Sequence, residues 1–157
     1  MKALTLTQPW ATLVAIGAKR IETRSWPTSH RGPLAIHAAK GFPKWAREFT
    51  IERVCYEAVK ACQSTSPARL WYPAYPVGVV VATCELIDCV QMREFSFEQG
   101  VVATGIGKYT HMLADNANER EFGDYSPGRW AWILSAVKCF EQPVPAKGAL
   151  GIWEWTR

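Results

Sequence analysis

The sequence predicts a single α+β domain in which a small, mainly antiparallel β-barrel is flanked by helices. The chain has 157 residues, a length typical of one domain, and 48% of them are hydrophobic, enough for a sizeable core. About six stretches have strand-like patterns and two have helical ones, and they do not alternate as β–α–β units. No internal repeat divides the chain, so residues 1–157 are treated as one domain.

The N-terminal part predicts three strands and a short helix. Residues 2–7 alternate like a strand, and residues 8–17 form an amphipathic helix with Trp10, Leu13 and Val14 on one face. Gly17 suits the left-handed residue that ends a helix. Residues 21–26 look extended, residues 27–32 form a turn-rich loop, and residues 33–39 predict a buried strand with His37 near its end.

The rest of the chain predicts one long helix and three further strands. The helix begins near Gly41 and carries an apolar stripe of helical spacing from Ile51 to Cys62. Residues 64–76, with Trp71 and Tyr72, form an irregular connection, because their three prolines exclude a regular element. Residues 77–88 predict a central strand, and residues 91–128 predict loops with short helical or strand pieces. Two further strands are predicted at residues 129–137 and 150–155, with a turn between them at 143–148.

Composition excludes several classes of protein. No window approaches the roughly 18 uninterrupted apolar residues of a membrane span, and the N-terminus lacks a signal-peptide layout. We therefore expect a cytoplasmic protein that does not associate with membranes. The five cysteines lack CxxC spacing, and the three histidines have no ligand spacing, so neither a disulfide framework nor a zinc site is indicated. We predict no metal and no cofactor.

The positive charge of the chain is concentrated in one window. Between Lys19 and Arg47, seven basic residues stand against a single acidic one, which gives +6, and the remainder of the chain carries −2. Such a distribution is expected of a protein that binds a polyanion. Charge alone leaves a second interpretation open, in which this window is a solvated face paired with acidic residues elsewhere.

A cluster of charged residues follows the first predicted helix. If residues 21–24 form a strand, Glu22 and Arg24 lie on one face of it, close to Lys19 at the end of the helix. One interpretation is a site for a phosphate or a polar base edge, with Arg24 as a forked donor and Lys19 as a point charge. The other is a structural ion-pair network. Gln8 and Trp10 would add a polar contact and a stacking surface, although core packing also explains Trp10.

Weaker candidates lie outside this cluster. Glu85 is the carboxylate of an otherwise apolar central strand, and it either serves a site or points to solvent. His37 is either a near-core residue or a catalyst. The segment 104–109 resembles a phosphate loop but lacks the required first glycine and the final serine or threonine, and the chain has no GxSxG motif.

These residues resemble a known family. Gln8-Pro-Trp-Ala-Thr-Leu, Gly17-Ala-Lys-Arg-Ile-Glu-Thr-Arg-Ser-Trp26 and the block at 75–89 are similar to the activating signal cointegrator homology (ASCH) domain, for which Gly-x-Lys-x-x-Glu-x-Arg after a helix is a signature. The resemblance implies a PUA-like fold and a basic cleft around Lys19, Glu22 and Arg24 that binds RNA or a nucleotide, with DNA also allowed. The residues proposed to contact nucleic acid are Gln8, Trp10, Lys19, Glu22, Thr23, Arg24, Trp26 and Lys40, with His37 and Glu85 as further cleft candidates.

The resemblance also implies two alternatives. Some small relatives deacetylate N4-acetylcytidine with a lysine, a threonine and a glutamate, and others are linked to RNA cleavage. Lys19 matches that lysine, whereas Glu22 stands where the threonine is expected, so a hydrolase would use Lys19 and Glu22 as its catalytic pair. The other alternative is a protein-interaction module of the transcription-coactivator type.

Overall fold

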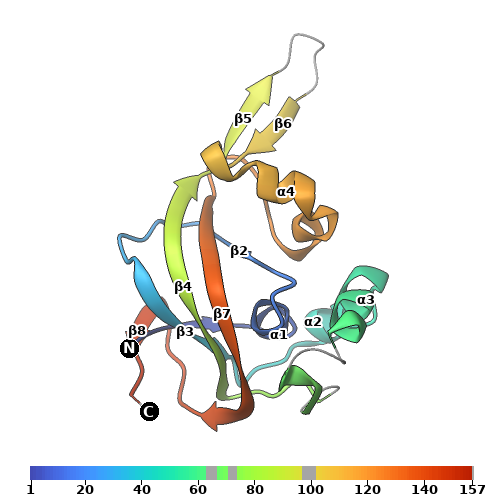
Figure 1. Cartoon of the computed structure of the whole chain (residues 1–157), viewed down its shortest axis with the longest axis vertical. Coiled ribbons are helices and arrows are strands. Elements are labelled where there is room, and N and C mark those ends of the chain that lie inside the picture. Colours follow the sequence, from blue (N-terminus) through green and yellow to red (C-terminus); the bar gives the residue numbers. More distant parts are fainter. Residues whose placement is uncertain (63–66, 71–73, 97–101, 157) are drawn as a thin grey trace.

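A computed structural model shows a curled six-stranded sheet with helices packed on one side (Figure 1). It describes residues 1–62, 67–70, 74–96 and 102–156. The strand order is β2-β7-β4-β3-β1-β8, in which the β1–β3 pair is parallel and the other pairs are antiparallel. This mixed half-barrel confirms the predicted α+β class. The strands are β1 (Lys2–Leu6), β2 (Ile21–Arg24), β3 (Gly32–Ala38), β4 (Val79–Gln91), β7 (Trp130–Pro145) and β8 (Ile152–Glu154).

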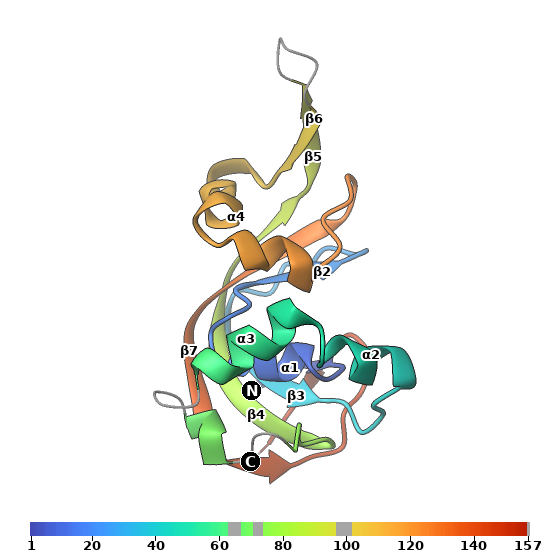
Figure 2. The same cartoon turned by 90° about the vertical axis from the view of Figure 1, so that its right-hand side faces the viewer.

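Three α-helices lie on one side of this sheet, and α1 is the one of them that packs directly against it, as Figures 1 and 2 both show. They are α1 (Trp10–Ala15), α2 (Lys44–Phe49) and α3 (Arg53–Ala61). The single long helix predicted from Gly41 is therefore wrong. The break falls at Thr50 and Ile51, β-branched residues that fit a helix poorly, and Glu52 is extended with ψ 137°. A 3-10 turn, η1 (Pro67–Leu70), lies in the predicted connection, whose Trp71 and Tyr72 are outside the described residues.

The segment 91–128 contains short strands and helical turns joined by loops, as its sequence predicted. A two-stranded hairpin, β5 (Arg93–Ser96) and β6 (Val102–Gly105), projects beyond the main sheet (Figure 1). After it come η2 (Gly107–Tyr109), α4 (His111–Asp115) and η3 (Ala117–Phe122). The turn predicted at 143–148 is partly wrong, because β7 continues to Pro145 and pairs there with Val79 at the start of β4. Prolines are tolerated at such irregular strand ends.

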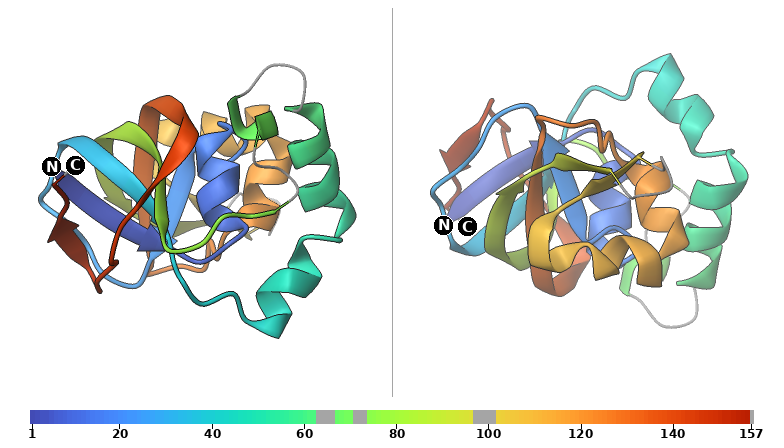
Figure 3. Two further views of the ribbon diagram at one scale, coloured as in Figure 1. Left: turned by 90° about the horizontal axis from the view of Figure 1, so that it is seen from below. Right: turned by 90° about the horizontal axis from the view of Figure 1, so that it is seen from above.

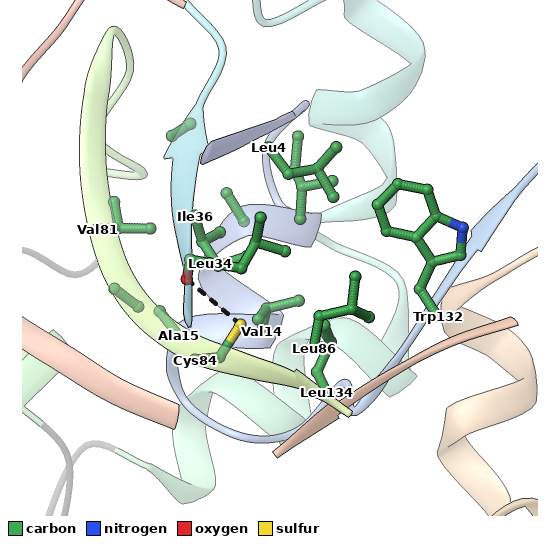
Figure 4. Packing of buried hydrophobic residues seen from close by; sticks show 14 residues of the cluster. Leu4, Val14, Ala15, Leu34, Ile36, Val81, Cys84, Leu86, Trp132 and Leu134 are labelled. Atoms are coloured by element: carbon green, nitrogen blue, oxygen red, sulfur yellow. Dashed lines mark hydrogen bonds between the residues drawn. The ribbon is translucent and has the colours of Figure 1, made fainter. Parts of the chain in front are cut away.

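The main core lies between the sheet and α1 (Figure 4). Five of the six residues of α1 are buried, so this helix lies inside the domain, where α3 and Phe122 cover its other side. Trp132 is fully buried, and Trp130 packs against the same cluster. Seen from above and below, the two termini lie side by side, joined by a hydrogen bond from the Met1 amino group to the Trp155 carbonyl oxygen (Figure 3).

Candidate functional site

A pocket of about 510 Å³ opens beside the free edge of β2. β2 pairs with β7 along its other edge, so its free edge faces the end of β1 across the curl of the sheet. Helices α1 and α2 and the segment between η3 and β7 supply the remaining walls. The lining residues are Thr5, Leu6, Thr7, Trp10, Glu22, Thr23, Arg24, Trp45, Glu121, Phe122, Gly123, Asp124 and Arg129.

Glu22 and Arg24 form an ion pair on one wall of this pocket. Arg24 Nε lies 3.0 Å from Glu22 Oε1, and Arg24 Nη2 donates a hydrogen bond of 3.1 Å to the Thr5 carbonyl oxygen. The guanidinium thus links two strands, β2 and β1, that are far apart in the order of the sheet. These two contacts fix the Arg24 guanidinium, so a carboxylate and a guanidinium lie side by side at defined positions.

Lys19 lies behind this wall and does not line the pocket. Its side chain is only 1% exposed, its Nζ donates to the Ile21 carbonyl oxygen, and Nζ lies 3.7 Å from Glu22 Oε2. Burial lowers the pKa of Lys19, while the nearby carboxylates of Glu22 and Glu119 act in the opposite direction. The expectation that Lys19 offers an accessible charge to a phosphate is wrong, because the ammonium is enclosed by protein.

Glu119 is a buried charge that sequence reasoning missed. It is 1% exposed, and its carboxylate accepts hydrogen bonds from the backbone N–H groups of Arg20 (2.8 Å) and Ile21 (3.1 Å) and from the Tyr125 hydroxyl (3.2 Å). The desolvation of the Tyr125 ring and the Glu119 carboxylate beside it raise the pKa of Tyr125. Glu119 comes from η3, in the poorly periodic segment, so no local pattern marked it. Its contacts fix the start of β2, and with it the position of Glu22.

Aromatic side chains form the wall beside α2. The Trp10 and Phe49 rings are stacked with centroids 5.1 Å apart, and the centroid of the Trp45 ring lies 5.6 Å from that of Trp10. Trp10 Nε1 donates to the Phe122 carbonyl oxygen at 2.8 Å, which fixes that indole. Trp45 is 60% exposed although it lines the pocket, and the sequence analysis had not singled it out.

The predicted site residues divide between several places. Thr23 lines the pocket, and its hydroxyl accepts a hydrogen bond from the Asp124 N–H at 3.1 Å. Gln8 is fully buried: its amide donates to the Pro76 carbonyl oxygen and accepts from Thr12 in α1, so it holds the helix in place.

The other predicted residues do not line this pocket. Trp26 packs edge-on against Trp132, with centroids 4.7 Å apart. Lys40 and His37 lie together in a second pocket. Glu85 sits in the middle of β4, paired with Pro33 and Ser135, and lines neither of these two pockets. These residues therefore do not share one pocket with Glu22 and Arg24, contrary to the expectation of a single cleft.

The charge of the first pocket also differs from the expected basic cleft. Its lining includes two guanidiniums, Arg24 and Arg129, and three carboxylates, Glu22, Glu121 and Asp124. Arg129 Nε lies 3.2 Å from Asp124 Oδ2, a second ion pair on the rim. Most of the basic residues of the 19–47 window are elsewhere, so this pocket is polar and mixed in charge.

Neither a metal site nor a reactive thiol is indicated in the described part of the chain. It contains no group of three or more His, Cys, Asp or Glu side chains that could hold a metal ion. Burial raises the pKa of Cys55 to about 11 and that of Cys84 to about 12, so these two thiols stay protonated. None of the described helices has the length and apolar character needed to cross a membrane.

Comparison with known proteins agrees with the signature residues. The model of the ASCH domain matches residues 4–144. Activating signal cointegrator 1 of Mus musculus is 36% identical over 92 residues, and that of Homo sapiens is 35% identical over 92 residues. In both cases the match covers 59% of this chain and 15% of the relative, so the chain corresponds to a small part of those proteins. The chain belongs to the ASCH domain family, and its fold is PUA-like.

Proposed function

We propose that this protein binds RNA by seating one base in the pocket between β2, β1 and α2. The observation that carries the proposal is the Glu22–Arg24 ion pair, which places a carboxylate and a guanidinium side by side among the residues that line the pocket. Bases carry donors and acceptors side by side on their Watson–Crick edges, and single-stranded RNA is recognised through such unstacked edges. Glu22 would accept from an amino or imino group of the base, and Arg24 would donate to a ring nitrogen or carbonyl oxygen.

The size and the aromatic wall of the pocket support the same ligand. Its volume of about 510 Å³ falls within the range of roughly 300–1,000 Å³ that is usual for small-ligand sites. The exposed indole of Trp45 supplies a face on which a base can stack, and the fixed Trp10 ring behind it limits its movement. Stacking of a base on an aromatic side chain contributes about 1–3 kcal/mol.

The charge of the pocket argues that a base enters it and a phosphate does not. Three carboxylates face two guanidiniums there, and the guanidiniums already have carboxylate partners. A phosphate would meet repulsion from those carboxylates, whereas the neutral edge of a base would find polar partners of both kinds.

Titration calorimetry with the four ribonucleosides and with short single-stranded RNA tests this proposal. We expect Trp45→Ala and Arg24→Gln each to weaken binding of the preferred nucleoside by about tenfold, the effect of removing one stacking or charged hydrogen-bond partner. Tyr56→Ala is the matched control, because Tyr56 is also exposed and aromatic but lies on α3 outside the pocket. Absence of binding to every nucleoside and RNA, or equal effects of Trp45→Ala and Tyr56→Ala, would refute the proposal. A DNA strand of the same sequence measures the preference for RNA.

A small hydrolase is the second candidate, and the lowered pKa of Lys19 beside Glu22 is the observation in its favour. A lysine of this kind can activate a hydroxyl nucleophile. Against it, Lys19 Nζ donates to the Ile21 carbonyl oxygen and has no surface in the pocket, and the Thr23 hydroxyl already accepts from Asp124. Incubation with N4-acetylcytidine and with labelled RNA separates the two functions, since a binding module leaves both substrates intact. The third candidate, a protein-interaction module, rests on the names of the mouse and human relatives alone.

A further inference from the structure

A second and larger pocket, of about 980 Å³, lies on the other side of Thr5. The end of β3, the start of β4, the end of β7 and the loop before β8 surround it. Its walls are mainly apolar, formed by residues such as Val77, Ala146 and Leu150, and Leu150 is 99% exposed at the rim. Neither the proposed function nor the ASCH signature residues account for this pocket.

The second pocket is positively charged, whereas the first is mixed in charge. Two lysines, Lys40 and Lys147, line it, and its described lining contains no carboxylate. Burial lowers the pKa of His37 on its wall, so the imidazole is neutral near pH 7 and the positive charge comes from the lysines. An anion is therefore favoured here, whereas the carboxylates of the first pocket disfavour one.

The wall of this pocket is closely built around His37. His37 Nε2 donates to the Ala146 carbonyl oxygen at 3.1 Å, and Trp153 packs edge-on against the ring with centroids 5.6 Å apart. Gly148 lies so close that a Cβ atom there would overlap Cε1 and Nδ1 of the His37 ring. These contacts fix the backbone of the loop on either side of Lys147, whose exposed side chain is part of the lining.

Thr5 lines both pockets, so the two are neighbours separated by the end of β1. Its carbonyl oxygen accepts from Arg24 on the side of the first pocket, and its hydroxyl accepts from Trp153 Nε1 at 3.0 Å. A strand of nucleic acid with one base beside Arg24 and Glu22 would leave that pocket past Thr5. The next part of its backbone would then meet the pocket that carries uncompensated positive charge.

From this arrangement we infer that the second pocket is a subsite for the sugar-phosphate backbone of the same RNA strand, with Lys40 and Lys147 contacting phosphates. The inference rests on the proposed function and deepens it, since it makes a single strand of two or more nucleotides the ligand in preference to a free nucleoside. The apolar wall packs against the sugar, and the two lysines supply an attraction that weakens as salt is added.

The test compares a ribonucleoside with a single-stranded RNA tetramer of the same base, using the full chain and calorimetry at several salt concentrations. The wild type should bind the tetramer more tightly. The double variant Lys40→Gln, Lys147→Gln should weaken tetramer binding by about three- to tenfold at low salt. It should also reduce the magnitude of the slope of log K against log salt by about 1.4, since each phosphate that loses its lysine contributes about 0.7. Nucleoside binding should stay unchanged. Lys138→Gln, an exposed lysine of β7 in neither pocket, is the control and should alter neither ligand.

The outcomes separate this inference from the proposed function. If the nucleoside binds but the tetramer binds no more tightly, or if the double variant behaves like Lys138→Gln, the second subsite is refuted and the base pocket stands. If inorganic polyphosphate binds as tightly as the tetramer with the same dependence on the lysines, the pocket is a general anion site and the inference also fails. If the wild type binds no nucleoside and no RNA, both proposals fall together.

Discussion

Replacement of Lys19 by methionine tests whether this lysine acts on the ligand or on the structure. Methionine has a similar length and no charge, so the variant removes the ammonium with little change in volume. The Ile21 carbonyl oxygen loses its donor, and Glu22 Oε2 loses the cation 3.7 Å away. Removing one partner of a buried ion pair costs about 3–5 kcal/mol, and we expect the lower end because Arg24 still neutralises Glu22.

A loss of about 3 kcal/mol leaves a domain of ordinary stability folded, because unfolding free energies are about 5–15 kcal/mol. For a chain of this size it corresponds to a fall of roughly 6–12 °C in the melting temperature. Urea denaturation followed by circular dichroism measures the free energy of unfolding, and Lys138→Met, an exposed lysine, should change it by less than about 0.5 kcal/mol.

Binding by the same variant completes the test. Lys19 does not line the pocket, so at a temperature where the variant is folded its affinity for the preferred nucleoside should stay within about threefold of the wild type, the limit set by small shifts of Glu22. The reasoning is wrong if Lys19→Met keeps its full stability and loses binding. That result would mean that the ammonium is available to the ligand and that the enclosed position of Lys19 is not the one that matters in solution.

Three further predictions concern groups that hold the two pockets in place. Glu119→Ala should lower the free energy of unfolding, measured by urea denaturation, by about 3–5 kcal/mol, because three hydrogen-bond donors lose a buried carboxylate. The control Glu121→Ala, at an exposed position, should change it by less than about 0.5 kcal/mol. Equal effects would refute the role of Glu119. Gly148→Ala should reduce the melting temperature by the equivalent of about 1–3 kcal/mol of overpacking against His37, whereas Gly41→Ala, with open space around it, should not. The lowered pKa of His37 predicts stability that is present above the unfolded pKa of 6.5 and is lost as the pH falls below it, because the unfolded chain binds the extra proton. In His37→Gln the fall in urea midpoint between about pH 7.5 and pH 5.5 should be smaller, and an unchanged fall would contradict this assignment.

The sequence was most informative where the pattern was local and periodic. The alternation at 2–7, the apolar run at 77–88 and the short helix after Pro9 each predicted an element that the structure contains. The long helix from Gly41 was wrong because an apolar stripe does not reveal that Thr50 and Ile51 interrupt it. The hairpin β5–β6 and the helices after it were not predicted individually, since their short segments carry too few residues to show a period.

The candidate site was predictable in its chemistry but not in its accessibility. The spacing of Glu22 and Arg24 placed both side chains on one face of β2, and the pair lines the first pocket. The spacing of the charged residues does not predict which lysine is accessible: Lys19 is enclosed, whereas Lys40 is exposed and lines the second pocket. The backbone next to Lys19 is bound by Glu119, a residue 100 positions further along the chain, which accepts hydrogen bonds from the N–H groups of Arg20 and Ile21, and no local spacing reveals such a contact.

The geometry gives the three charged residues of the Gly-x-Lys-x-x-Glu-x-Arg signature different tasks. Glu22 has the Lys19 ammonium near one oxygen and the Arg24 guanidinium near the other, and this arrangement holds the carboxylate in one orientation. A free carboxylate on an edge strand would rotate and would bind cations from solvent. Lys19 therefore acts as a positioning residue for Glu22. Because its ammonium is enclosed by protein, ions in solution screen its interaction with Glu22 only weakly. In the proposed RNA complex, the charge that attracts the backbone comes from other residues, Lys40 and Lys147, which line the pocket on the far side of Thr5.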